Sequence, residues 1–310
     1  MKTGAVLIFH KEEDAILFEA IIIALKARYT LVSISELETL LLQKKSLKNI
    51  IHISFDDGER SFYEIVFPVL KKHQVAVSLF ISPEVIAENK NYWFQETADY
   101  DTALMYKIVA GQMGIPVADI SSFSYQSLFK CLTIGQINSV IAAYQQLTQC
   151  GKKNPQNISV EQLKEMQASG LVTFGAHTLH HPILINEDAE SAEAEIKGSI
   201  GQLEKLIGQP VKYFAYPNGR PQLDFGEREM NYLKQNNIVL GFATTYDNLG
   251  PETNLLSIPR MSFAMMGLAP YHPLVHLRLS LGKRWINWGQ IGKPSEKEMR
   301  KRMKKALGLA

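Results

Sequence analysis

The sequence has few cysteines, little net charge and no long apolar run. Only two of its 310 residues are cysteines, Cys131 and Cys150, and neither lies in a metal-ligand spacing, so we expect reduced thiols and no disulfide. The formal net charge of +2 is too small to predict nucleic acid as a partner across the surface. The apolar runs at 5–9 and 20–25 are too short for a signal peptide or a membrane span. These absences predict a cytoplasmic protein without a nucleic-acid partner.

The composition is that of an ordinary globular chain, with 46% hydrophobic and 21% charged residues. Short apolar runs alternate with longer amphipathic ones, which is typical of strands joined by helices in a mostly parallel sheet or barrel. Strands are expected near residues 4–9, 49–55, 75–82, 171–176, 211–216, 238–244 and 255–260. The clearest helices are predicted at 187–207 and from Ser159, which opens a capping-box pattern, to Ser169.

Two segments lie outside this alternation. Residues from about 88 to 157 have helical patterns without a convincing strand, which predicts a helical insertion. From residue 266 the chain becomes basic, so we divide it into a barrel domain at 1–265 and a basic C-terminal extension at 266–310. The extension is expected to be either a solvated terminus or a peripheral contact to an anionic membrane, with Trp285 and Trp288 at the interface. Its last helix-compatible stretch contains Lys297, Arg300, Lys301, Arg302, Lys304 and Lys305.

Two adjacent carboxylates end one of the predicted strands, in the stretch Ile53-Ser-Phe-Asp-Asp-Gly58. Neighbouring side chains on a buried strand point to opposite faces, so Asp56 and Asp57 can be tolerated together only where the strand ends. Strand ends that open into loops are also where functional sites tend to lie. The pair is therefore a candidate site, and Gly58 would let the backbone turn away from it.

A histidine cluster follows a later predicted strand, in Phe174-Gly-Ala-His-Thr-Leu-His-His-Pro182. His177 and His181 are four residues apart, the spacing that lets two imidazoles on one helical turn face one metal ion, whereas His180 would point elsewhere. Because the ends of parallel strands share one face of a barrel, this cluster is expected to meet the two carboxylates. One carboxylate and two histidines leave open positions on a zinc-like ion, as a catalytic site requires.

The motifs resemble those of the polysaccharide deacetylases of the NodB-homology type, carbohydrate esterase family 4. ISFDDG at 53–58 looks like the family's TFDDG motif, and HTLHHP at 177–182 looks like its H-(S/T)-x-x-H-P motif. A third stretch, Tyr213-Phe-Ala-Tyr-Pro-Asn-Gly219, is similar to the third family motif in its FAYPxG form. The order and spacing of the three agree with the family, and the resemblance spans roughly residues 4–262.

This resemblance implies a distorted (β/α) barrel and a metal-dependent hydrolase that removes N-acetyl groups from amino sugars. By the same resemblance Asp57, His177 and His181 would hold a divalent ion, with Zn²⁺ as the first choice among several metals that accept these ligands. Asp56 would be the general base that takes a proton from the attacking water. The backbone N–H of Asn218 would stabilise the oxyanion, a role that does not depend on its side chain.

The chain departs from the family pattern in the groups that tune and complete this chemistry. The arginine that usually opens the third motif and orients the base is replaced by Ala215. Arg260, at the end of the last predicted strand, could enter the site from another direction, or it could be an ordinary arginine at the barrel end. The substitution leaves open how Asp56 is tuned.

The histidine that usually acts as general acid is also missing, because no Leu-x-x-His strand follows residue 244. His272 and His276 lie in a proline-flanked stretch that is more typical of a loop. His10 ends the first predicted strand and resembles the N-terminal YH motif of the poly-N-acetylglucosamine deacetylase branch. Its ordinary pKa of about 6.5 suits proton donation at neutral pH, so we predict His10 as the general acid.

The first hypothesis is therefore removal of an acetyl group from an N-acetylated sugar in a poly- or oligosaccharide or a glycolipid intermediate. A second possibility is a deacylase of an O-acetyl ester or of a non-sugar amide. A third is a catalytically silent carbohydrate-binding protein that has kept the barrel. The intact set of Asp56, Asp57, His177 and His181 argues against silence, because buried polar groups are costly to maintain.

Overall fold

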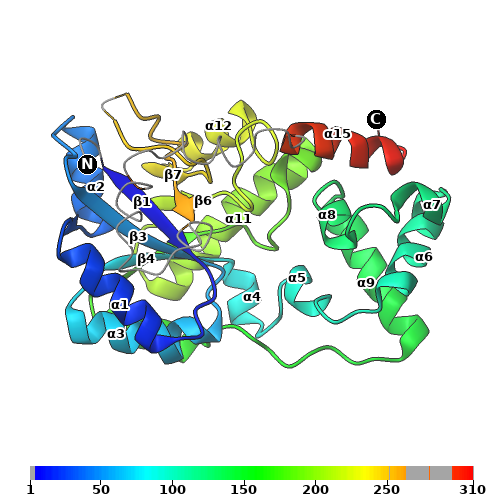
Figure 1. Cartoon of the computed structure of the whole chain (residues 1–310), viewed down its shortest axis with the longest axis horizontal. Helices are drawn as coiled ribbons and strands as arrows, with labels where there is room; N and C mark the ends of the chain where they lie inside the picture. Colours follow the sequence, from blue (N-terminus) through cyan, green and yellow to red (C-terminus); the bar gives the residue numbers. More distant parts are fainter. Residues whose placement is uncertain (1–3, 251, 263–278, 280–294, 310) are drawn as a thin grey trace.

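The computed structural model describes residues 4–250, 252–262, 279 and 295–309. Its centre is an eight-stranded parallel sheet with the strand order β7-β6-β5-β4-β3-β1-β8, and β2 pairs with β3 off this path (Figure 1). The strands are β1 Ala5–Phe9, β2 Thr30–Leu31, β3 Ile50–Asp56, β4 Val77–Ile81, β5 Val172–Ala176, β6 Tyr213–Ala215, β7 Leu240–Phe242 and β8 Met261–Ser262. The mostly parallel sheet confirms the expected fold class.

The sheet curls into a distorted barrel, and a short segment at residues 258–262 closes the barrel between β7 and β1. Ile258 forms a parallel bridge with Phe242 of β7, and Met261 of β8 pairs with Leu7 of β1. The predicted strand at 255–260 is therefore a single bridge followed by a very short strand. β2 was not predicted, since two residues are too few to give a periodic pattern.

Helices surround the barrel and continue into a separate helical region. Around the barrel lie α1 Ala15–Lys26, α2 Ile34–Leu42, a π-helical turn at Phe62–Val66, α3 Phe67–His73, α4 Pro83–Ala87, α10 Val160–Ala168, a 3₁₀ turn at Leu184–Asn186, α11 Ala189–Ile207 and α12 Glu227–Gln235. The predicted capping box is present at the start of α10, where Ser159 and Gln162 cap each other. Among the described residues, none of the helices is both long and apolar enough to cross a membrane.

Alternation along β3 separates a polar barrel interior from the apolar layer under the helices. Ile51, Ile53 and Phe55 belong to the main hydrophobic core beneath the helices. The intervening His52 and Ser54 face inward, where the His52 ring lies 2.9 Å from both the Val32 carbonyl oxygen and Ser78 Oγ. Asp56 is the last residue on this inner side, so the strand carries its carboxylate to one end of the barrel.

The predicted insertion at about 88–157 is helical, contains no strand and has a hydrophobic core of its own. It comprises α5 Trp93–Glu96, α6 Thr102–Met113, α7 Val117–Ile120, α8 Tyr125–Phe129 and α9 Ile134–Thr148. The C-terminal helix α15, Glu296–Ala306, adds Met303 to this second core, and Leu307 beyond its end belongs to the same core. Figure 1 shows the insertion to one side of the sheet, with α15 in red above it.

Candidate active site

A tight turn at the end of β3 places both carboxylates at the same end of the barrel. Asp57 and Gly58 both have left-handed backbone conformations, with φ values of 71° and 73°. The Gly58 N–H donates a hydrogen bond of 2.9 Å to the Asp56 carbonyl oxygen, which closes the turn. A Cβ atom at Gly58 would lie only 2.8 Å from Cγ2 of Ile81. Glycine is therefore required here, and the expected strand-end position of the acid pair is present in the structure.

The histidine motif forms a loop after β5, so the expectation of a helical turn was wrong. Thr178 and His181 have positive φ values of 65° and 60°, which reverse the chain and are incompatible with a right-handed helix. The His181 N–H donates a 3.0 Å hydrogen bond to Oγ1 of Thr178 and so closes the loop. The two imidazoles still lie close together, with ring centroids of His177 and His181 4.8 Å apart and an angle of 73° between the ring planes.

Glu195, on α11, holds this loop from behind. Its Oε2 accepts the backbone N–H groups of Leu179 and His180 at 2.9 and 3.0 Å. Its Oε1 lies 2.6 Å from Nδ1 of His180, whose Nε2 is 2.9 Å from Glu84. The Glu195 hydrogen bond, together with Glu84, outweighs burial and raises the pKa of His180 to about 9. His180 is thus held as a cation pointing away from the other two histidines, as expected.

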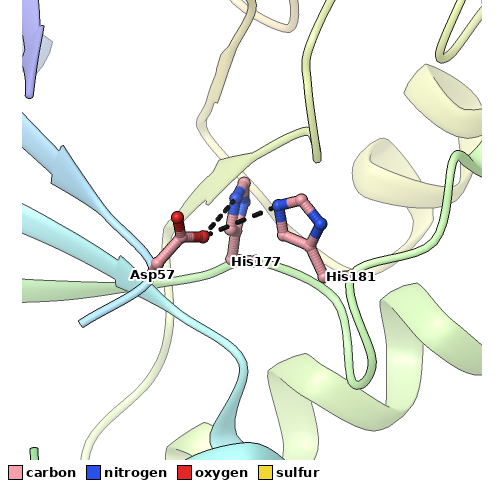
Figure 2. Close-up of side chains that lie close together, drawn as sticks. All are labelled: Asp57, His177 and His181. Atoms are coloured by element: carbon pink, nitrogen blue, oxygen red, sulfur yellow. Dashed lines mark ion pairs between the residues drawn. The ribbon is translucent and has the colours of Figure 1, made fainter. Parts of the chain in front are cut away.

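Asp57, His177 and His181 form the one group of potential metal ligands found among the described residues, and all three side chains are buried. Figure 2 shows the Asp57 carboxylate on one side of the two rings, with its ion pairs to both drawn as dashed lines. Oδ1 of Asp57 is 3.7 Å from Nε2 of His177 and 3.6 Å from Nε2 of His181. Neighbouring ligands of a tetrahedral ion about 2.1 Å from each lie roughly 3.4 Å apart, so the spacing fits such an ion. Oδ1 of Asp57 is buried and has no hydrogen-bond partner among the described residues, which leaves it available as a ligand.

The protonation states also suit a metal site. Nδ1 of His177 lies 2.6 Å from the Ala215 carbonyl oxygen, which can only accept, so Nδ1 carries the proton and Nε2 presents its lone pair. Burial lowers the pKa of His177 to about 4, and burial with the nearby His177 lowers the pKa of His181 well below its usual value. Burial and the charge of Asp56 raise the pKa of Asp57 well above its usual value. A bound cation would stabilise the ionised form of this carboxylate.

Arg260 binds Asp56 through both of its terminal nitrogens. Nη1 and Nη2 donate to the two carboxylate oxygens of Asp56 at 2.6 and 2.8 Å, and the Arg260 side chain has no exposed surface. Burial raises the pKa of Asp56, but the charge of Arg260, with that of His177, outweighs it and lowers the pKa overall. The structure therefore brings Arg260 to Asp56, while Ala215, in the place of the usual arginine, uses its carbonyl to orient His177.

His10 lies directly after β1 and beside the end of β3, because Phe9 pairs with Phe55 in the sheet. Its side chain is exposed and makes no hydrogen bond with the described residues. The pKa of His10 is lowered overall, because desolvation by the surrounding protein and the charge of Arg260 outweigh the charge of Asp56, which raises it. The structure thus brings His10 near Asp56, and its role as general acid stays a prediction. His272 and His276 lie outside the described residues.

The third motif forms a turn similar to that of the acid pair. Asn218 and Gly219 are both left-handed, with φ values of 57° and 74°. A Cβ atom at Gly219 would lie 2.8 Å from Oγ1 of Thr244 and 3.0 Å from the Tyr216 carbonyl oxygen, so only glycine fits. The Asn218 N–H has no hydrogen-bond partner in the part of the chain that the structure describes, and it remains available to a ligand.

Sequence analysis missed an aromatic stretch of the insertion that supports the metal-ligand group. The Tyr92 hydroxyl donates to the Asp57 carbonyl oxygen at 2.8 Å, and Nε1 of Trp93 donates to the His181 carbonyl oxygen at 3.0 Å. The half-buried Phe94 ring meets the His181 ring edge-on, with centroids 5.2 Å apart. Three consecutive aromatics in a polar segment were the available signal.

Comparisons with known proteins agree with this geometry. The family model described as polysaccharide deacetylase matches residues 43–238. Among solved structures, the deacetylase PplD of Streptococcus pyogenes is 18% identical, with 89% of this chain and 96% of that chain covered and a TM-score of 0.58. IcaB of Ammonifex degensii is 20% identical, with 84% and 92% covered and a TM-score of 0.57. A de-N-acetylase of Aggregatibacter actinomycetemcomitans is 16% identical, with 89% and 98% covered and a TM-score of 0.56.

At these identities the solved structures show that the fold is shared. No curated protein matches the chain in the sequence comparison. The family model, in contrast, covers more than half of the chain, including the acid pair, the histidine loop and the third motif. The chain belongs to the polysaccharide deacetylase family.

Proposed function

We propose that the protein is a metal-dependent hydrolase that removes N-acetyl groups from amino sugars in a poly- or oligosaccharide or a glycolipid intermediate. The observation that carries the proposal is the position of Oδ1 of Asp57, which lies within 3.7 Å of two imidazole nitrogens. This oxygen is buried and has no hydrogen-bond partner in the part of the chain that the structure describes. An ionised carboxylate fixed by an arginine stands next to it. Together they combine a ligand set for a divalent ion with an adjacent base.

Asp57, His177 and His181 would hold the divalent ion, with Zn²⁺ as the first choice. Such an ion supplies a Lewis acid and lowers the pKa of water to about 7 when it is bound. The neutral imidazoles are the form of histidine that a cation requires, and a bound cation would stabilise the ionised form of Asp57.

Asp56 would take the proton from the attacking water. Each of its oxygens accepts one hydrogen bond from Arg260 and keeps a second lone pair for that water. The lowered pKa of Asp56 keeps it ionised at neutral pH, so it is ready to act as a base. Arg260 also holds the carboxylate plane fixed, which removes the cost of orienting it during the reaction.

His10 and Asn218 would complete the reaction. The imidazole of His10, beside Asp56, would donate a proton to the leaving amine, and general acid catalysis of this kind contributes about 100- to 10,000-fold. The Asn218 N–H, which has no partner among the described residues, would stabilise the negative charge that develops on the carbonyl oxygen. Asp56 and His10 thus divide the roles of base and acid between two neighbouring strand ends.

The cytoplasmic location and the peripheral membrane contact remain predictions. In α15 the side chains of Lys297, Lys301, Arg302 and Lys305 are exposed, which is compatible with contact to an anionic membrane. Arg300 is buried and cannot take part in such a contact.

Acetate release tests the proposal. The substrates are N-acetylglucosamine oligomers, lipid-linked N-acetyl sugars and O-acetylated sugars, each with and without a chelator, and Asp56→Asn is the matched control. Release from N-acetyl substrates that is lost with the chelator and in the variant is expected. Release from O-acetyl substrates alone would favour the esterase, whereas no release and no bound metal would favour the silent carbohydrate-binding protein.

A further inference from the structure

We propose that the C-terminal helix α15 is part of the active site, because its Arg300 positions the turn that presents the Asn218 N–H to the substrate. The inference rests on the proposed function in one respect, since the use of this N–H as an oxyanion donor belongs to that function. The positioning itself is a property of the folded chain and can be measured separately.

Arg300 connects the barrel to the helical insertion. Its Nη2 donates to Oδ1 of Asp224, in the loop after β6, at 2.8 Å. Its Nη1 donates to the Lys130 carbonyl oxygen, just after α8 of the insertion, at 2.8 Å. Only 4% of Arg300 is exposed, and Asp224 is 1% exposed, so this ion pair is shielded from water and from salt. The side chain of one residue of α15 therefore ties two distant segments together.

The two residues that Arg300 contacts, Asp224 and Lys130, also form hydrogen bonds with the side chain of Asn218. The second oxygen of Asp224, Oδ2, accepts from Nδ2 of Asn218 at 2.5 Å and from the Arg220 N–H at 2.8 Å. The ammonium group of Lys130 donates to Oδ1 of Asn218 at 2.8 Å. The Asn218 amide is thus held at its nitrogen by an anion and at its oxygen by a cation, which fixes its orientation.

The hydrogen bonds to the Asn218 side chain restrain a left-handed turn. Asn218 and the following Gly219 both have positive φ, a conformation that glycine adopts freely and that asparagine tolerates better than most other residues. An N–H group stabilises a developing oxyanion effectively only when it is already oriented before the reaction. Holding the side chain of Asn218 at both ends fixes the backbone that carries this N–H.

α15 is itself firmly placed by the insertion. Met303 and Leu307 belong to the hydrophobic core of the insertion and are 4% and 1% exposed. Glu296, in its first turn, lies 2.6 Å from Nε of Arg220, in the same loop as Asp224. The helix lies above the insertion in Figure 1, with its first turn toward the barrel. α15 therefore packs on the insertion through its apolar side chains and contacts the loop after β6 through its ion pairs, so it links the insertion to the barrel.

Arg300→Met tests the proposal, and Lys301→Met is the matched control because Lys301 is exposed on the same helix. Three quantities are measured for both: hydrogen exchange of peptides covering 216–224, the affinity for Zn²⁺, and kcat and KM for acetate release. In Arg300→Met we expect faster exchange at 216–224 and a kcat about 100-fold lower, the effect of losing one oxyanion donor. KM and Zn²⁺ affinity should change little, since Asp57, His177 and His181 lie outside this network.

Arg300→Lys provides a second variant in case the methionine variant does not fold. Lysine keeps the positive charge but has a single terminal nitrogen, so it should bind Asp224 or the Lys130 carbonyl, not both. The increase in exchange and the fall in kcat should therefore be smaller than in Arg300→Met. Unchanged exchange at 216–224 in the folded Arg300 variants would overturn the proposal, as would an effect equal to that of Lys301→Met. If the wild-type protein releases no acetate, the proposed function fails, while the exchange result still decides the positioning.

Discussion

Arg260→Met should leave the Asp56 carboxylate buried without its partner. Both oxygens of Asp56 lose a charged hydrogen bond, and 3% exposure gives the acid almost no access to water. Removing one member of a buried ion pair costs about 3–5 kcal/mol, so the free energy of unfolding should fall by about that amount. The pKa of Asp56 should rise, because burial then acts with only His177 and His10 opposing it.

The activity of this variant should depend on pH in a specific way. A base that is protonated at neutral pH is inactive, so kcat should fall about 100-fold or more at pH 7 and recover partly as pH rises. Acetate release measured across pH should therefore show its acidic limb displaced to higher pH. Urea denaturation of the variant and of the double variant Asp56→Asn/Arg260→Met provides the stability test, because removal of both charges should cost less than removal of Arg260 alone. An acidic limb identical to that of the wild type would refute this reasoning.

Three further predictions follow from the same geometry. His10→Asn should lower kcat about 100- to 10,000-fold in steady-state assays while Zn²⁺ affinity is kept, whereas an unchanged kcat would exclude His10 as the acid. Asp57→Ala should abolish high-affinity Zn²⁺ binding in titration calorimetry, and retained binding would exclude the proposed ligand group. Burial lowers the pKa of His52 from 6.5 to about 4, so the unfolded chain binds the extra proton between these pH values. The stability advantage of the wild type over His52→Gln in urea should therefore shrink by about 3 kcal/mol from pH 7 to pH 4, and a constant difference would contradict the buried neutral ring.

Local patterns predicted the elements that carry the main motifs. Apolar runs located β3 and β5, and the acid pair and the histidine cluster could be placed at their ends because polar groups interrupt a buried strand only there. Arg260 and His10 each end a predicted strand, and parallel strand ends meet at one face. They became candidates because the family resemblance called for an arginine beside Asp56 and for a histidine acid that the usual positions lack.

The remaining parts of the site depend on contacts between residues far apart in the chain. The histidine loop was expected to be helical, because a spacing of four residues cannot distinguish a helical turn from a loop with two left-handed residues. Tyr92 and Trp93 reach the metal-ligand loops from the insertion, and Arg300 reaches Asp224 from the last helix. No periodicity encodes such contacts, so the supporting residues became visible only in the folded structure.

The most direct test of the account is a Zn²⁺ titration of chelator-treated protein, with acetate release from an N-acetylglucosamine oligomer as the readout. The account predicts that activity returns and saturates at one ion per chain, as expected for the one ligand group found among the described residues. It also predicts no recovery in Asp57→Ala. Full activity without added metal, or equal recovery in the variant, would contradict the account.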